Sequence, residues 1–196
     1  TTDRAAHRAL QELRRRFPRW EDLQAARSSA VAAAIRQSGL AHVKAVRIRG
    51  ILRALTERFG RPTLAPLRRM PMRRAMTTLA ELPGVGPKTA ACVLLFGFKR
   101  DVCPVDTHVF RIAQRLGWAA RSASPPKVQE WIAAHAPRGR RTELHLNLIR
   151  HGRQVCRAIR PRCGECVLAG ICPSAVVSPH VHAAAVSRHS QPSRGR

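Results

Sequence analysis

The apolar residues of this chain recur at helical spacing along almost its whole length. Leu10, Leu13 and Phe17 fall on one face of a helix over residues 4–17, which Pro18 ends. The same period, interrupted by glycines and prolines, predicts further helices over residues 29–37, 42–58, 72–81, 87–98, 106–116, 125–135 and 141–155. No stretch alternates apolar and polar residues as a strand would. The pattern therefore predicts an all-α fold of short helices.

The charge of the chain indicates a polyanionic partner. Its 196 residues, 44% of them apolar, can form a sizeable core, and 36 Lys and Arg against 11 Asp and Glu leave a formal charge of +25. Such a surface is typical of proteins that bind DNA or RNA, although a GC-rich coding bias toward arginine is an alternative explanation. Tyrosine is absent and aromatic residues make up 4%, so stacking on single-stranded bases has little material. The composition favours contact with the backbone of a duplex.

The sequence has no feature that predicts export or insertion into a membrane. No run of 18 apolar residues could span a membrane, and the first residues contain no hydrophobic signal core. We expect an intracellular protein that does not bind membranes, cytoplasmic and associated with the nucleoid of a bacterial-type cell. Residues 174–196 are rich in Ser, Pro, His and Arg and are expected to form a disordered basic tail.

Residues 82–88, Leu-Pro-Gly-Val-Gly-Pro-Lys, separate two predicted helices. Gly84 and Gly86 permit a sharp turn and a close approach of the backbone to a ligand, and Pro87 suits the first position of a helix. Because the N–H groups at a helix start can bind a phosphate oxygen, this hairpin is predicted to hold one DNA strand without reading its sequence. An ordinary tight turn between helices is the alternative.

Four cysteines with the spacing x6-x2-x5 lie close together near the end of the chain. They are Cys156, Cys163, Cys166 and Cys172. Without an export signal, such an array is typical of metal ligands rather than of disulfides, and four thiolates suit either Zn²⁺ or an iron–sulfur cluster. Zinc sites usually pair two short knuckles, whereas here wider gaps flank one short pair, which favours the cluster. Cys92 and Cys103 lie outside the array and are predicted to be small core residues.

Three motifs resemble the endonuclease III family, helix-hairpin-helix (HhH-GPD) DNA glycosylases of base excision repair. They are Leu-Pro-Gly-Val-Gly-Pro-Lys-Thr-Ala over residues 82–90, Val-Asp-Thr-His over residues 105–108, and the cysteine spacing. The resemblance, which covers residues 1–173, implies a six-helix domain over residues 1–105 with the hairpin at 82–88. It further implies a helical domain over residues 106–173, in which the four cysteines bind a [4Fe-4S] cluster. In this register the family's usual N-terminal segment is expected to be missing.

The resemblance also implies an activity. It implies that the chain is a bifunctional glycosylase and AP lyase, which removes oxidised pyrimidines from duplex DNA and cleaves 3′ to the abasic site by β-elimination. Lys88 would attack C1′ of the flipped nucleotide, and the Asp106 carboxylate would stabilise the developing positive sugar while also capping the next helix. A free lysine amine has a pKa of about 10.4, so attack at neutral pH requires an environment that favours the neutral form. Burial against the hairpin and nearby arginine charge are expected to provide it.

Contacts with damaged double-stranded DNA, bound by a monomer, are expected at three places. Leu82, Gly84, Val85 and Gly86 form the hairpin. Leu40 resembles the family's wedge residue, which fills the gap left by the flipped base, and an ordinary core position is its alternative. Arg160 and Arg162, between the first two cysteines, are expected to contact phosphates. Two other functions stay open on the residues alone: a monofunctional mismatch glycosylase of the same fold, and a non-catalytic, metal-stabilised DNA-binding module.

Overall fold

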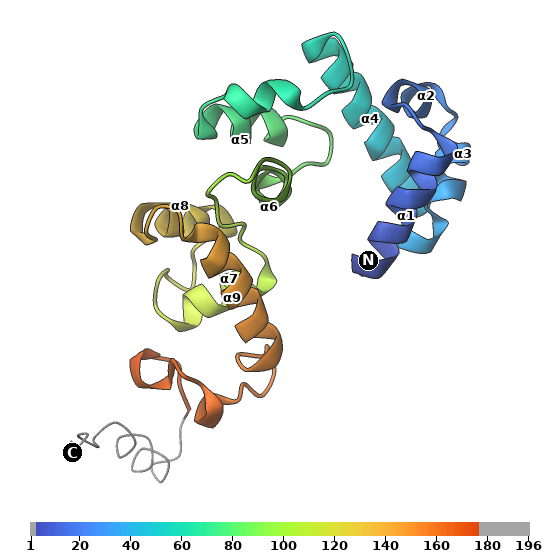
Figure 1. The fold of residues 1–196 in the computed structure, drawn as a ribbon. Coiled ribbons are helices and arrows are strands. Elements are labelled where there is room, and N and C mark those ends of the chain that lie inside the picture. The colour runs from blue at the N-terminus through green and yellow to red at the C-terminus, as the bar shows by residue number, and fades with distance from the viewer. Residues whose placement is uncertain (1–2, 177–196) are drawn as a thin grey trace, which may run out of the picture. The chain divides into compact units, whose positions relative to one another are not determined.

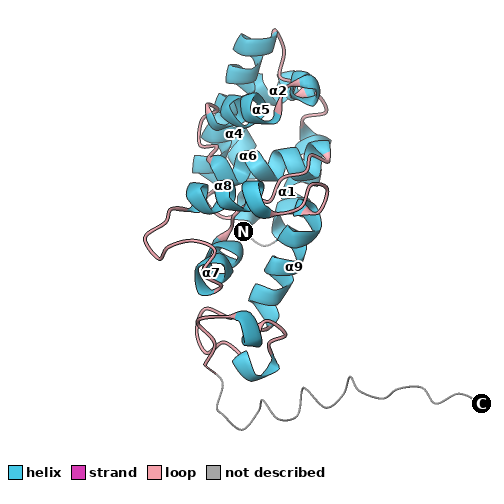
Figure 2. Cartoon of the chain, turned by 90° about the vertical axis from the view of Figure 1, so that its left-hand side faces the viewer, coloured by secondary structure: helices cyan, strands magenta, loops and turns pink. Residues whose placement is uncertain are grey.

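The computed structural model describes residues 3–176, and every regular element in that range is a helix (Figures 1 and 2). The all-α prediction is therefore confirmed over this range. By packing, the chain divides into two compact units, Thr1–Leu94 and Leu95–Arg196. The domain boundary predicted between residues 105 and 106 stays a prediction, and nearly all of the predicted tail lies outside the described residues. Among those residues, no helix is both long and apolar enough to cross a membrane.

The first unit is built around one long helix, α4. Its α-helices within the described residues are α1 (Asp3–Arg16), α2 (Trp20–Ala25), α3 (Ser28–Ala34), α4 (Ala41–Phe59), α5 (Met72–Ala80) and α6 (Pro87–Cys92). Helices α2 and α3 pack directly on α4, and α1 packs on α3 (Figure 1). The apolar pattern missed α2, because a helix of six residues with one buried side chain, Leu23, has no readable period.

The core of the first unit comes from the apolar faces of α1 to α4. Its buried side chains include Leu13, Leu23, Val31, Ile35 and Leu52. The last helix of the unit, α6, packs on α5, so these two helices form the pair that the hairpin joins. Beyond Cys92 the helix continues as a π turn over Val93–Gly97, which accounts for the single helix predicted over residues 87–98.

The second unit contains α7 (Thr107–Arg115), α8 (Pro125–His135) and α9 (Arg141–Gln154). Its core includes Val109, Ile112, Val128 and Ile132, together with Cys103, whose predicted burial is confirmed. Cys92 is only half-buried, so the core position predicted for it is wrong. After α9 the chain forms short 3₁₀ turns at Cys163–Glu165 and Ala169–Ile171.

Candidate functional site

The hairpin between α5 and α6 is a sharp glycine turn. Gly84 has a φ of 73°, in the left-handed region that favours glycine, and Gly86 is extended and precedes α6 as its N-cap. Within the turn, Val85 N donates to Leu82 O at 3.0 Å, and Ala90 N donates to Gly86 O at 3.0 Å. Pro87 is the first residue of α6, as predicted. The turn thus leads directly into the first turn of a helix.

Helix α4 supports the hairpin from behind. A Cβ atom on Gly84 would lie 2.9 Å from Arg47 Cδ, and one on Gly50 would lie 3.6 Å from the Pro83 ring. The side chain of Leu82 is 5% exposed and belongs to the core. The DNA contact predicted for Leu82 can therefore involve only its main chain, because its side chain anchors the hairpin. Arg47 was missed by the sequence analysis, since only the packing of α4 brings it to the hairpin.

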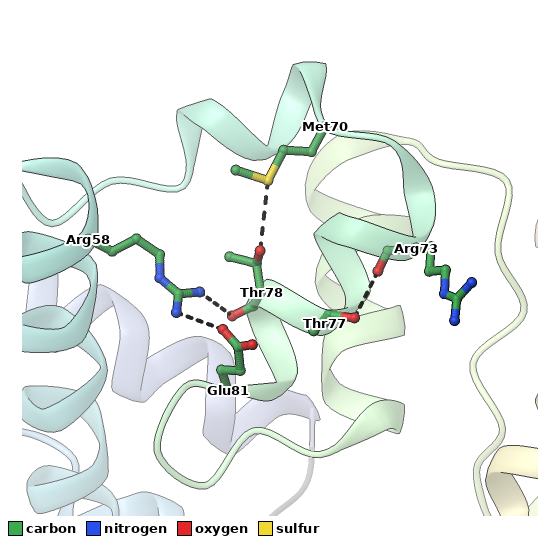
Figure 3. A network of polar contacts seen from close by, with 6 residues as sticks. All are labelled: Arg58, Met70, Arg73, Thr77, Thr78 and Glu81. Atoms are coloured by element: carbon green, nitrogen blue, oxygen red, sulfur yellow. Dashed lines mark hydrogen bonds and ion pairs between the residues drawn. The ribbon is translucent and has the colours of Figure 1, made fainter.

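A second set of contacts joins α4 to the end of α5, just before the hairpin. Arg58 Nη2 donates to Glu81 Oε2 at 2.6 Å, and Nη1 donates to Thr78 O at 3.4 Å (Figure 3). The Thr78 hydroxyl lies 3.9 Å from the Met70 sulfur. These contacts hold the chain entering the turn against the C-terminal half of α4.

Lys88 is the second residue of α6, and its side chain is exposed. The burial that the sequence analysis expected for this amine is wrong, because α6 buries Ala90 and Ala91 and leaves Lys88 at solvent. The amine is therefore accessible to a ligand that rests on the hairpin. A ligand bound there would remove water from it.

Leu40 is also at the surface, with 77% of the side chain exposed. It has a φ of 51° and precedes α4, while Lys44 Nζ donates to Ser38 O at 2.6 Å across the base of the loop. The alternative that Leu40 is a core residue is therefore wrong. An exposed apolar side chain on a loop closed by a hydrogen bond is what a wedge requires, and that role stays a prediction.

Asp106 caps helix α7, as expected. Its Oδ1 atom accepts hydrogen bonds from His108 N at 2.9 Å and Val109 N at 2.8 Å. Oδ2 accepts no hydrogen bond from the described residues of the second unit and so is available to another donor. The half-buried carboxylate is thus oriented by the helix through one oxygen and presents the other. Lys88 belongs to the first unit and Asp106 to the second, and their pairing stays a prediction from the family resemblance.

The four cysteines line one small cavity in the second unit. Around it lie Cys156, Cys163, Cys166 and Cys172, together with Arg115, Val155, Pro161, Arg162, Ala169, Ser174 and Ala175. Across residues 3–176, no three His, Cys, Asp or Glu side chains converge as ligands of a single metal ion. Four thiols around one cavity match the donor set of a [4Fe-4S] cluster, in which each iron takes one thiolate.

Two family patterns match the chain at these features. That of the HhH-GPD superfamily base excision DNA repair proteins matches residues 1–137. The chain belongs to this superfamily. The iron–sulfur binding domain of endonuclease III matches residues 156–172, from the first to the last cysteine of the array. The resemblance stated from the motifs is thus confirmed, and the cofactor of this HhH-GPD protein is a [4Fe-4S] cluster.

Individual relatives agree with the superfamily. An Arabidopsis thaliana protein that carries the name of a DNA glycosylase is 39% identical over 153 residues, which are 78% of this chain and 52% of the plant protein. Endonuclease III of Thermotoga maritima is 33% identical over 172 residues, which are 88% of this chain and 76% of that enzyme. A solved structure of a trapped covalent intermediate of endonuclease III with DNA is 28% identical, with a TM-score of 0.75, over 89% of this chain and 78% of the other. The HhH-GPD chain spans about half the length of the plant protein.

Two arginines of α7 connect this helix to residues 156–172 of the HhH-GPD chain, the cysteine loop. Arg115 Nη1 donates to Cys156 Sγ at 3.2 Å and to Arg157 O at 2.7 Å, and its own carbonyl lies 3.4 Å from Cys172 Sγ. Arg111 Nη2 donates to Cys156 O at 2.8 Å and to Gly152 O at 3.0 Å. Neither contact could be predicted from the sequence, because the partner of a helical arginine is known only once α7 is placed beside the loop. Their positive charge lies where thiolate charge would accumulate.

A histidine and two further arginines lie at or near the cysteine loop. His151 Nε2 lies 3.6 Å from Cys166 Sγ, and burial lowers the pKa of His151 below its usual value, which favours a neutral ring. Arg160 is exposed and has a φ of 50°, while Arg162 is exposed and lies 3.4 Å from Glu165 Oε2. Both arginines are accessible at the surface, and their contact with phosphates stays a prediction.

Proposed function

We propose that this chain is a bifunctional DNA glycosylase and AP lyase that acts on oxidised pyrimidines in damaged double-stranded DNA. The observation that carries the proposal is the exposed amine of Lys88 in the first turn of α6, directly after a glycine hairpin backed by α4. The similar solved structure, named as a trapped covalent intermediate of endonuclease III with DNA, supports a covalent step, for which Lys88 is the nucleophile that we propose.

Lys88 would act as the nucleophile. DNA lying on the hairpin would displace water from the amine, which loses its proton and attacks C1′ of the flipped nucleotide. The C1′–N bond breaks and the base leaves with a proton. Ring opening then gives a Schiff base between Nζ and C1′, and loss of a proton from C2′ expels the 3′ phosphate by β-elimination. The strand is thereby cleaved 3′ to the abasic site.

Asp106 would provide the electrostatic and proton-transfer part of this reaction. Its Oδ1 is held by two main-chain N–H groups of α7, which fixes the side chain without using Oδ2. An anionic Oδ2 stabilises the positive charge that develops on the sugar and accepts the proton released by the attacking amine. The cap and the chemistry therefore use different oxygens of the same carboxylate.

The four cysteines would each bind one iron of the [4Fe-4S] cluster through a thiolate. Bound to a cluster, Cys156 and Cys163 would anchor both ends of residues 157–162, a segment to which Arg115 also donates at Arg157 O and Ala158 O. Arg160 and Arg162 in this segment would then contact backbone phosphates from a rigid loop. The reaction at the sugar uses none of these cysteines.

The DNA would be held by the main chain of Gly84, Val85 and Gly86 and opened by Leu40. Main-chain contacts to phosphate position the duplex without reading sequence. An exposed leucine can occupy the space of an extruded base and so offset part of the cost of unstacking. We propose that a monomer acts in this way on the DNA of a bacterial-type nucleoid.

Borohydride reduction tests the proposal. Incubation with a duplex that contains one oxidised pyrimidine should give a covalent complex of protein and DNA, which denaturing electrophoresis detects. K88A should lose the complex, whereas K127A, a matched change at an exposed lysine of α8, should retain it. Base release without a trapped complex would instead identify a monofunctional glycosylase. Binding without base release would identify a non-catalytic module.

A further inference from the structure

A second cationic surface of the first unit lies on a different face of α4 from the hairpin. It is a hollow of about 600 Å³ between α2 and the C-terminal half of α4, closed by the turn that follows α4. The polar residues of its walls are Glu21, Gln24, Arg49, Arg53, Thr56 and Arg61. None of these residues is a motif residue or a hairpin contact. The hollow is therefore a separate structural feature.

The hydrogen-bond acceptors on one wall of this hollow are already occupied. Arg49 Nε donates to Gln24 O at 3.2 Å, and Arg49 Nη1 donates to Ser28 Oγ at 2.8 Å. The Thr56 hydroxyl, which has one proton, lies 2.9 Å from Gln24 Oε1 and 2.9 Å from Leu52 O. Because Oε1 of Gln24 faces this hydroxyl, the two N–H groups of the side-chain amide face away from it and can donate to a ligand. The wall thus offers donors rather than acceptors.

The charges around the hollow also favour an anionic ligand. Arg53 and Arg61 are exposed and, within the described part of the chain, neither forms an ion pair. Together with Arg49 they provide three guanidinium groups, against one carboxylate, Glu21. Guanidinium groups bind phosphate through paired N–H donors, and an amide donor beside them adds a neutral contact. A tetrahedral oxyanion matches this set of groups.

We propose that the hollow is a phosphate-binding site that takes a backbone phosphate of nucleic acid, apart from the hairpin. The phosphate chemistry follows from the arginines and Gln24 alone. The assignment to nucleic acid rests on the proposed function and on the net charge of +25, which favours a polyanion over a single small anion. Free phosphate is the other source of the same group.

The first arm of the test uses inorganic phosphate as the probe. The double variant R53S/R61S removes two side chains that form no ion pair, so folding should be unaffected. The control R4S/R8S removes the same charge from exposed positions of α1 in the same unit. At matched ionic strength, replacing chloride by phosphate should raise the melting temperature of wild type and control by a few degrees more than that of R53S/R61S, because the general stabilisation by phosphate acts on all three chains.

The second arm measures the salt dependence of binding to an undamaged duplex, so that no base is excised. R53S/R61S should flatten the log–log slope by roughly one unit more than the control, since each phosphate contact contributes ~0.9. Loss of the phosphate effect with an unchanged slope would assign the site to free phosphate instead of nucleic acid. If R53S/R61S equals its control in both arms, the hollow binds no phosphate. Neither arm depends on Lys88. Failure of the borohydride trap would therefore overturn the proposed function, whereas these two arms would still show whether the hollow binds phosphate.

Discussion

The Arg115 guanidinium donates to the Cys156 sulfur at 3.2 Å, which joins the last turn of α7 to the first cysteine of the array. The same helix begins at Asp106, whose carboxylate caps it. One short helix therefore carries the proposed catalytic carboxylate at its start and a contact to a proposed cluster ligand near its end. Within the second unit, α7 thus connects the Asp106 carboxylate directly to the cysteine array.

Replacing Arg115 should make the cluster easier to lose. R115Q removes a charged donor to a thiolate sulfur and two donors to the loop carbonyls, and loss of such supporting contacts typically weakens metal binding by 10- to 100-fold. We expect faster decay of the broad absorbance near about 400 nm in the presence of an iron chelator. R153Q, at an exposed arginine of α9, is the matched control and should decay at the wild-type rate. Equal decay of the two variants would show that the Arg115 contact does not support the cluster.

Replacing Gly84 should disrupt the hairpin for two separate reasons. In G84A the residue must adopt a φ of 73°, which costs about 1 kcal/mol or more, and its Cβ would lie 2.9 Å from Arg47 Cδ. G60A has a similar φ of 77° and meets nothing within 4 Å, so it isolates the backbone strain. Urea unfolding should show a larger loss of stability for G84A than for G60A. Adding R47A to G84A should recover the difference in the free energy of unfolding. If G84A loses no more stability than G60A, Arg47 has no role.

The two oxygens of Asp106 can be separated by mutation. D106N keeps an oxygen that can accept the cap hydrogen bonds, so its free energy of unfolding should stay within about 0.5 kcal/mol of wild type, whereas D106A should lose about 1 kcal/mol. Both variants should lose base release and borohydride trapping, because each lacks the charge. A D106N chain that retains wild-type activity would show that the carboxylate acts only as a cap.

Cys103 should make stability depend on alkaline pH. Burial is the main reason that the pKa of its thiol rises to about 12, and the negative charge of Asp106 adds to the effect. The unfolded thiol has a pKa of about 8.5, so deprotonation favours the unfolded chain as the pH rises from about 9 toward 12. The contribution is fully present below pH 8 and is lost across that range. C103A should have a flatter stability profile above pH 9 than wild type, measured by urea unfolding.

The reactivity of the same thiol gives an independent check on its burial. In the native protein at pH 9, iodoacetamide should leave Cys103 unmodified, because the thiolate that reacts is almost absent and the side chain is 2% exposed. Peptide mass spectrometry would detect the modification after unfolding. Rapid labelling of the native chain would contradict the burial.

Local patterns in the sequence were sufficient for much of the site. The cap at Asp106, the helix start at Pro87 and the turn at Gly84 each depend on one residue and its immediate neighbours. The expected burial of Lys88 was wrong, because exposure depends on which residues of α6 face the core, and Ala90 and Ala91 occupy that face. Leu40 could not be assigned to core or surface from its pattern, since a leucine beside a glycine occurs in both.

The sequence by itself determined the helices, the glycine turn and the spacing of the four cysteines, because helix period, glycine conformation and chain spacing act over a few residues. Only the tertiary structure placed Arg47 behind Gly84 and Arg115 on Cys156, and left Arg53 and Arg61 around one hollow with no ion-pair partner among residues 3–176. These contacts join residues far apart in the chain, or on helices whose relative packing decides which faces meet. Arginine is compatible with almost any exposed helical position, so its partner is decided by packing and not by the residues beside it.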